Sequence, residues 1–201
     1  MPDRLPADAA GIARAAALLL DGELVAFPTD TVYGIGCRIG DADALARLFA
    51  AKRRPIDKAV AWLVASLADA TTRGFVADER AALLADQFWP GALTLVLPAA
   101  GGATTQAFRI PDHDVTRALL EAAGPLATSS ANRSGEPDTL DADDVAVAFA
   151  DTDEPAATLD GGRVPGGVAS SVVDLSVSPP RLVREGALPR AEIEALIGPI
   201  D

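Results

Sequence analysis

Residues 23–37 read ELVAFPTDTVYGIGC, an apolar run followed at once by small polar side chains. The segment 23–28 has the length and apolar content of a buried strand, and Pro28 ends it. Strand ends and the loops that leave them form the usual ligand crevice of open α/β sheets. This stretch therefore predicts both an element of a sheet and the beginning of a binding site.

Helix-like and strand-like segments alternate along the chain. Asp8 and Asp41 are placed to cap two helices, one over 8–21 and one that Pro55 ends. Further helices are predicted at 77–88, 114–123, 141–150 and 189–197, and further strands at 59–66, 92–98, 105–111, 125–131, 157–162, 170–176 and 181–186. Because the late strands follow one another without helices, we expect an α/β fold whose sheet is mixed. The acidic stretch 149–158 is predicted to be a surface loop.

Length and composition limit the function classes. The 201 residues predict a single domain, 1–201, and the net charge of −12 disfavours general nucleic-acid binding, so any polyanion site must be a local basic pocket. The single cysteine, Cys37, excludes an intramolecular disulfide, and with the single histidine, His113, it gives too few ligands for a His/Cys zinc site. No metal site is predicted. Without a signal peptide or a membrane-spanning apolar run, we expect a soluble cytoplasmic protein.

Polar clusters interrupt the predicted elements at several places. Residues 52–58 read KRRPIDK, 128–135 read TSSANRSG, and 160–171 read DGGRVPGGVASS, while Arg109 and Arg184 lie within strands. Each cluster alone is typical of a tight turn or of a helix C-terminus, where basic side chains are favoured. Together they bring arginines, lysines, hydroxyls and glycines to the loops of one sheet, which indicates a site for phosphate and carboxylate groups.

Familiar nucleotide and hydrolase motifs do not fit. The chain has no P-loop, and the glycines of GIGCRIG, at 34, 36 and 40, are spaced one residue too widely for a dinucleotide fingerprint, so tight-turn geometry is expected there. A serine hydrolase would need His113 as its base and a G-x-S-x-G elbow, which is missing. His113 is expected to cap a helix or to pack.

Seven stretches occur in a recognisable order between about residue 23 and 187: FPTDTVYGIGC, KRRPIDK, WPGALTLVL, FRIPDH, ATSSANRSG, GGVASSVVDLS and LVREGA. In this order the chain resembles the YrdC-like family, the threonylcarbamoyl-AMP synthases. The resemblance implies a twisted open α/β sheet with a concave, positively charged face. Some family members carry an additional C-terminal domain, and on this resemblance the chain would be the catalytic domain alone.

The resemblance also implies a reaction. L-Threonine, bicarbonate and ATP would give threonylcarbamoyl-AMP, pyrophosphate and water, as the first step of threonylcarbamoyladenosine modification of tRNA. ATP is a substrate, with Mg²⁺ expected to be held mainly by its phosphates. The product would pass to a tRNA threonylcarbamoyl-transferase complex, and direct tRNA binding is expected to be weak or absent.

Residue roles are carried over from the family position by position. Lys52, Arg54 and Lys58 would act on the ATP phosphates as catalytic residues, and the ATP-binding positions are Arg54, Lys58, Thr105, Ser130, Asn132 and Arg184. The threonine-binding positions are Thr31, Tyr33, Arg109, Thr128 and Ser170. The loop Ala169-Ser170-Ser171 departs from the Glu-Ser-Thr or Pro-Ser-Thr of many relatives. Lys52 and Lys58 are the only lysines, and we hypothesise that a mobile ammonium follows charge toward the leaving group better than a guanidinium fork.

Arg109 is the basic residue whose orientation the sequence predicts. Alternation in TQAFRIP sends Thr105, Ala107 and Arg109 to one face of a strand, and Phe108 to the core face. On the family assignment the guanidinium would hold the threonine carboxylate through two parallel hydrogen bonds. The alternative is an arginine paired with an acidic neighbour on a solvated face.

Two other functions remain open at this stage. One is a carbamoyl-transfer domain of the hydrogenase-maturation type, although the acylphosphatase and zinc-finger segments of those proteins are absent here. The other is a non-enzymatic module of the same fold that binds double-stranded RNA or tRNA on its concave face. The net charge of −12 and the clustering of hydroxyls with basic residues argue against the RNA-binding module.

Overall fold

The structure is a computed structural model that describes residues 3–55, 58–166 and 168–201. Its strands are β1 (Asp3–Pro6), β2 (Val25–Phe27), β3 (Gly34–Arg38), β4 (Ala61–Leu63), β5 (Leu93–Pro98), β6 (Thr105–Arg109), β7 (Leu126–Ser130), β8 (Ala157–Asp160), β9 (Ser171–Asp174) and β10 (Arg181–Arg184). Its helices are α1 (Ala9–Leu20), α2 (Ala42–Ala51), α3 (Leu67–Thr71), α4 (Glu79–Phe88), α5 (Asp114–Ala123), α6 (Ala142–Ala148) and α7 (Arg190–Ile197). Residues 56 and 57 of the KRRPIDK stretch and residue 167 of the GGVASS stretch lie outside the described residues.

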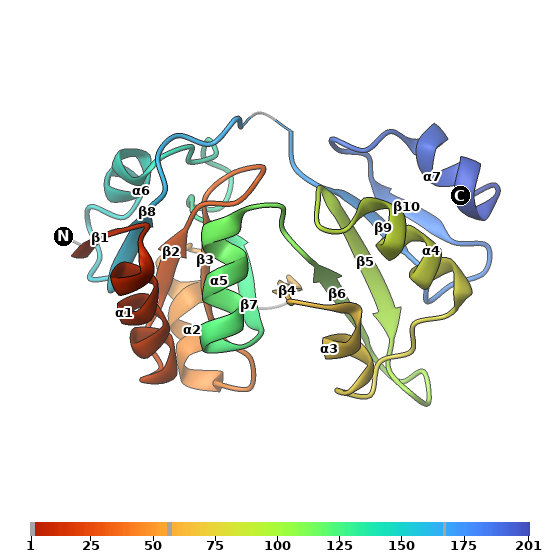
Figure 1. The fold of residues 1–201 in the computed structure, drawn as a ribbon, viewed down its shortest axis with the longest axis horizontal. Coiled ribbons are helices and arrows are strands. Elements are labelled where there is room, and N and C mark those ends of the chain that lie inside the picture. The colour runs from red at the N-terminus through yellow and green to blue at the C-terminus, as the bar shows by residue number, and fades with distance from the viewer. Residues whose placement is uncertain (1–2, 56–57, 167) are drawn as a thin grey trace.

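The strands form one 10-stranded mixed sheet in the order β1-β8-β2-β3-β7-β4-β6-β5-β9-β10. The short strand β4 joins two halves, because it pairs antiparallel with β7 and parallel with β6. Figure 1 shows α1, α2, α5 and α6 with β1, β8, β2, β3 and β7, whereas α3, α4 and α7 accompany the other half. The predicted fold class, an open mixed α/β sheet with packed helices, is confirmed.

Helices cover both faces of the first half. Alternation along β2 and the residue before it sends Val25 and Phe27 into a core with α1 and α5, and Leu24 and Ala26 into a second core with α2 and α6. This two-sided burial explains why the strand reads as a continuous apolar run.

Helices cover only one face of the second half. Leu93, Leu95 and Leu97 of β5 pack with Phe108 of β6 into a core with α3, α4 and α7. The alternate residues of these strands point to the opposite face, which no helix of the described residues covers, so this face is available to line a site.

Most predicted elements agree with the structure to within a few residues, and α5 has its predicted bounds. The caps at Asp8 and Asp41 are confirmed, since their side chains accept hydrogen bonds from Gly11 N and Ala44 N. The strands β1 and β3 and the helix α3 were not predicted. No helix among the described residues is long and apolar enough to cross a membrane.

One prediction about single residues was wrong, and a second was right in part. Gly34 and Gly36 were expected in a tight turn, but they lie in the buried strand β3, where an added Cβ would lie 3.1 Å from the Phe27 ring at Gly34 and 3.1 Å from Thr128 Oγ1 at Gly36. Close packing rather than turn geometry therefore selects glycine here. His113 occupies the position before α5 but makes no capping hydrogen bond, and of the two expected roles only packing remains, against the backbone near Gly161.

Candidate functional site

A cleft of about 550 Å³ lies between the two halves of the sheet. Its floor includes the uncovered face of the second half, with Thr94 and Val96 from β5, Ala107 and Arg109 from β6, and Val172 from β9. The opposite wall comes from the loop after β2 and from the end of β7. Eight of the predicted site residues line the cleft: Thr31, Tyr33, Arg54, Arg109, Thr128, Ser130, Ser170 and Arg184. The structure thus brings most of the predicted site together from segments far apart in the sequence.

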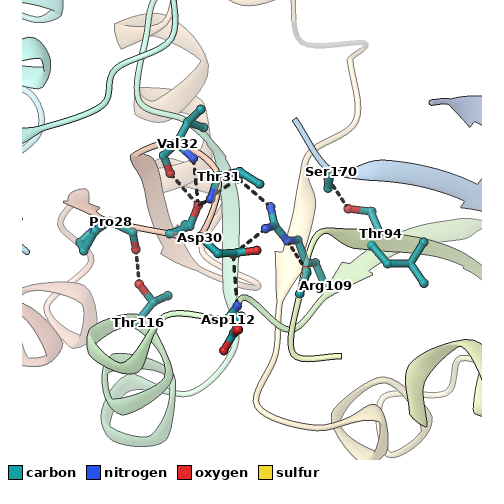
Figure 2. Close-up of polar contacts among 12 residues, drawn as sticks. Pro28, Asp30, Thr31, Val32, Thr94, Arg109, Asp112, Thr116 and Ser170 are labelled. Atoms are coloured by element: carbon teal, nitrogen blue, oxygen red, sulfur yellow. Dashed lines mark hydrogen bonds and ion pairs between the residues drawn. The ribbon is translucent and has the colours of Figure 1, made fainter. Parts of the chain in front are cut away.

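Arg109 is the best-anchored of these residues, and Figure 2 shows its contacts. Its Nε donates to Gly91 O (2.9 Å), its Nη1 to Thr31 Oγ1 (3.1 Å), and its Nη2 pairs with Asp30 Oδ1 (2.6 Å). The side chain is 9% exposed, and burial lowers its pKa while Asp30 opposes that shift. The alternative interpretation expected Arg109 to pair with an acidic neighbour on a solvated face. The acidic partner is present, but the arginine is buried.

The guanidinium of Arg109, which lines the cleft, keeps further donor capacity. It has five N–H groups, and these three contacts use one on each nitrogen, which leaves one N–H on each Nη. Asp30 also accepts a hydrogen bond from Asp112 N (3.1 Å), so the carboxylate that orients the arginine is itself fixed. Sequence reasoning missed Asp30, although it belongs to the quoted PTDTVYG stretch, because its partner lies 79 residues away.

The loop after β2 presents threonine hydroxyls at the cleft. Thr29 Oγ1 donates to Val32 O (2.6 Å) and shares a hydrogen bond of 3.1 Å with Thr31 Oγ1. Tyr33 also lines the cleft, but its hydroxyl donates to Gly162 O (2.8 Å) and accepts from Gly161 N (3.1 Å). Burial raises the pKa of Tyr33 to about 12, so this hydroxyl remains a neutral tether between the two loops.

On the facing wall, Ser170 connects two strands of the second half. It shares a hydrogen bond of 2.9 Å with Thr94 through their side-chain oxygens, as Figure 2 shows. Arg184 donates from Nη2 to Ser170 O (2.8 Å) and lies 3.2 Å from Ser170 Oγ. Burial lowers the pKa of Arg184, and Asp138 opposes that effect. Two predicted positions, one for each substrate, are therefore in direct contact.

The S-x-N pair is a compact hydrogen-bonded unit. Ser130 Oγ donates to Asn132 Oδ1 (2.5 Å), and Asn132 Nδ2 donates to Glu136 O (2.6 Å). Ser130 and the buried Thr128 line the cleft, whereas Asn132 is 7% exposed and lies behind them.

Lys52 stabilises this unit from the side away from the cleft. Its Nζ donates to the backbone carbonyls of Ser130 and Asn132, and its own carbonyl accepts from Ser134 N (3.0 Å). The side chain is 1% exposed and does not line the cleft. Burial, reinforced by Arg54, lowers the pKa of Lys52 to about 8. The structure thus places this lysine as a buried support for the S-x-N loop.

The remaining basic residues of the KRRPIDK stretch differ in position. Arg54 lines the cleft and donates to Ala59 O (2.7 Å), whereas Lys58 is exposed and is not among the described lining residues. Thr105 is exposed at the far end of β6 from Arg109, about 13 Å away at the rise of an extended strand. The geometry therefore does not bring Lys58 and Thr105 to the cleft with the other residues.

Arg133 is a second residue that sequence reasoning missed. Its Nε donates to Ala148 O (2.9 Å), its Nη1 donates to Ala51 O (3.3 Å), and its Nη2 pairs with Asp151. It therefore joins the C-terminal ends of α2 and α6, where a positive charge is favoured, to the S-x-N loop. Only its position next to Asn132 signals this role in the sequence.

The backbone at Ser170 is closely packed against Gly186. A Cβ at Gly186 would lie 2.1 Å from Ala169 O and 2.6 Å from the carbonyl carbon of Ser170. We expect Gly186→Ala to lower the free energy of unfolding by about 1–3 kcal/mol, because the loop that carries Ser170 must move. Urea unfolding of this variant beside Ala187→Ser, an exposed neighbour, is the measurement. Equal stability of the two variants would contradict the expected clash.

Comparisons with known proteins agree with this geometry. The family Sua5_yciO_yrdC, described as "Telomere recombination", matches residues 17–186. The threonylcarbamoyl-AMP synthase of Pyrococcus abyssi is 43% identical over 195 residues, which cover 92% of this chain and 57% of that protein. The threonylcarbamoyl-AMP synthase of Chromohalobacter salexigens is 40% identical over 177 residues, which cover 82% of this chain and 92% of that protein.

A solved structure shows the same fold. The crystal structure of P. abyssi Sua5 complexed with L-threonine superposes with a TM-score of 0.89 at 39% identity, covering 100% of this chain and 62% of the other. The chain thus spans about three fifths of the length of the P. abyssi protein. The matched residues include every strand that lines the cleft, and the chain belongs to the Sua5–YciO–YrdC family.

Proposed function

We propose that the chain is a threonylcarbamoyl-AMP synthase, which converts L-threonine, bicarbonate and ATP to threonylcarbamoyl-AMP, pyrophosphate and water. The observation that carries the proposal is that one cleft contains a buried arginine with two remaining N–H groups, two further arginines, and a set of threonine and serine hydroxyls. Such a cleft suits one carboxylate and one phosphate chain held side by side. The two relatives named as threonylcarbamoyl-AMP synthases support the same reaction.

The chemistry requires positioning and charge stabilisation rather than a protein nucleophile. Bicarbonate takes up a proton and loses water to give CO2, and the neutral threonine amine adds to CO2 and releases a proton to become a carbamate. A carbamate oxygen then forms a bond to the α-phosphorus of ATP while the bond from that phosphorus to the bridging oxygen of pyrophosphate breaks. Holding two anions at reacting distance costs electrostatic repulsion, which cationic side chains and oriented N–H groups offset.

The site divides into two regions on this proposal. Arg109, oriented by Asp30, would hold the threonine carboxylate, with Thr31 and Thr128 beside it. Arg54 and Arg184 would hold the nucleotide phosphates, with Ser130 between the regions. Thr105 and Lys58 would reach the nucleotide only after a change in position. Threonylcarbamoyl-AMP would pass to a tRNA threonylcarbamoyl-transferase complex.

Mg²⁺ bound with ATP would supply neutralisation of the charge that develops on the leaving pyrophosphate. Oxygen donors suit this ion, and the cleft offers the carboxylate of Asp138 together with several hydroxyls.

An RNA-binding module is less well supported. Of the three arginines that line the cleft, Arg109 is neutralised by Asp30, and Asp138 adds a negative charge among the described lining residues. A duplex RNA site needs an extended series of cations for its phosphates.

The proposal is tested by pyrophosphate release. We expect the purified chain to release pyrophosphate from ATP only when both L-threonine and bicarbonate are present, and other amino acids to be poor replacements. Each amino acid is supplied in turn, with and without bicarbonate, and Arg109→Ala prepared in parallel controls for host enzymes. Release of ADP and phosphate, or indifference to bicarbonate, would overturn the assignment.

A further inference from the structure

Asp138 is an acidic side chain in a cleft whose other charged lining residues, among those the structure describes, are arginines. It lies on the segment between β7 and α6, is exposed, and lines the cleft with Arg54 and Arg184. Among the residues that the structure describes, it forms no ion pair. Its charge reaches Arg184 in the cleft and the buried Lys52 behind it, since it opposes the lowering of the pKa of both side chains by burial.

The positive charge that the cleft offers is smaller than the negative charge of a nucleotide triphosphate without a metal ion. Arg109 is paired with Asp30, and Lys52 lies behind the cleft on two backbone carbonyls. Arg54 and Arg184 remain for the phosphates, and they cannot neutralise a triphosphate. Asp138 makes the imbalance worse, because like charges at close range repel strongly where solvent is partly excluded.

A divalent cation on the nucleotide would reverse the effect of Asp138. Mg²⁺ is usually held by one or two carboxylates together with substrate phosphates and waters, rather than by an all-protein cage. Among the described residues, no group of three or more His, Cys, Asp or Glu side chains could hold a metal ion without the substrate. A single carboxylate facing the phosphate region is the donor set that such a shared site needs.

We propose that Asp138 is the protein's own contact to the divalent cation that accompanies the nucleotide. This inference rests on the proposed function, since it requires that the cleft binds ATP. Asp138 then discriminates between two forms of the same substrate. It attracts the nucleotide that carries a cation and repels the nucleotide without one.

The discrimination is measurable without turnover. ATP binding is followed by calorimetry in excess Mg²⁺ and again in EDTA, for the wild type, Asp138→Asn and Glu136→Gln. Glu136 is an exposed acid two positions away on the same segment that does not line the cleft, so its variant loses the same charge without the proposed contact. We expect Asp138→Asn to weaken binding in Mg²⁺ about tenfold and to leave binding in EDTA unchanged or tighter. Glu136→Gln should shift neither value more than about twofold.

A second measurement detects the contact itself. With Mn²⁺ in place of Mg²⁺, water-proton relaxation by the bound Mn²⁺–ATP should increase in Asp138→Ala, because water replaces a carboxylate oxygen on the ion. Equal weakening in Mg²⁺ and EDTA, together with unchanged relaxation, would overturn the role of Asp138. A wild-type chain that binds ATP in neither condition would instead overturn the proposed function, so the two failures are distinguishable.

Discussion

Replacing Arg109 with alanine is expected to lower kcat/KM for L-threonine by about a hundredfold to several thousandfold. The reason is that a buried carboxylate clamp, once broken, leaves an unpaired charge and costs about 3–5 kcal/mol. The measurement is pyrophosphate release at varied threonine, combined with calorimetric binding of ATP in the absence of threonine. ATP binding should change far less than threonine binding.

Asp30 adds a consequence for stability. Without Arg109 its carboxylate, 17% exposed, loses its cationic partner and keeps only the hydrogen bond from Asp112 N. The free energy of unfolding should therefore fall as well, and activity must be compared at a temperature where the variant is folded. Arg109→Lys should recover little, because an ammonium cannot reach Gly91 O, Thr31 and Asp30 together in the fork geometry.

Arg80→Ala is the matched control for Arg109. Arg80 pairs with Asp78 on a partly exposed surface of the same half of the molecule, and such a pair contributes about 0–1 kcal/mol. Its variant should keep nearly full activity. Loss of ATP binding with threonine binding intact in Arg109→Ala would show that the arginine serves the nucleotide and that the two regions of the site are assigned the wrong way round.

The orientation of Arg109 could be predicted because strand alternation is a local property. The pattern in TQAFRIP correctly placed Phe108 in the core and Ala107 and Arg109 on the other face. The same alternation predicts that Thr105 shares this face, but it gives no information on which end of the strand meets the cleft. That depends on how β6 is placed against β4 and β5, which is set by tertiary packing.

The strand β3 could not be predicted because its composition is typical of a turn. Gly34 and Gly36 have low strand propensity, and their fit depends on the Phe27 ring and Thr128 of neighbouring strands. Asp30 and Lys52 show the same limit for side chains, since each bonds to residues more than 70 positions away. At the end of a helix, a lysine followed by two arginines has the pattern of a solvated terminus, so nothing local signals that Lys52 is buried.

Replacing Lys52 is expected to lower both stability and turnover. In Lys52→Ala the carbonyls of Ser130 and Asn132 lose their donor and a cavity remains, so the free energy of unfolding should fall by about 2–4 kcal/mol. Lys52→Met fills the volume but supplies no hydrogen-bond donor. Lys52→Arg forces a wider group into a fully buried space, which should lower the free energy of unfolding by about 1–3 kcal/mol. Turnover should fall with stability, because the S-x-N loop loses its support.

The sequence suggested that Lys52 is a lysine because a mobile ammonium acts on the phosphates. Its buried position instead suggests that it supports the S-x-N loop. Direct action on the phosphates predicts lost turnover with unchanged stability in Lys52→Ala. Support of the loop predicts that both fall together, and that Lys58→Ala, at an exposed position, changes stability by less than about 0.5 kcal/mol. Urea unfolding and pyrophosphate release on the same preparations separate the two roles.

The pH dependence of stability tests the burial of Lys52 independently. Its pKa is about 8 in the folded chain against 10.5 for an ordinary lysine, so between these two pH values the unfolded chain binds a proton that the folded chain does not. Stability relative to Lys52→Met should therefore rise with pH, by roughly 2 kcal/mol between about pH 7.5 and 9.5. Urea unfolding of both proteins at the two pH values measures this difference. A stability difference that stays constant with pH would mean that the ammonium keeps its ordinary pKa and that Lys52 is solvated. A solvated lysine is compatible with a contact to bound phosphates but not with a buried support of the loop.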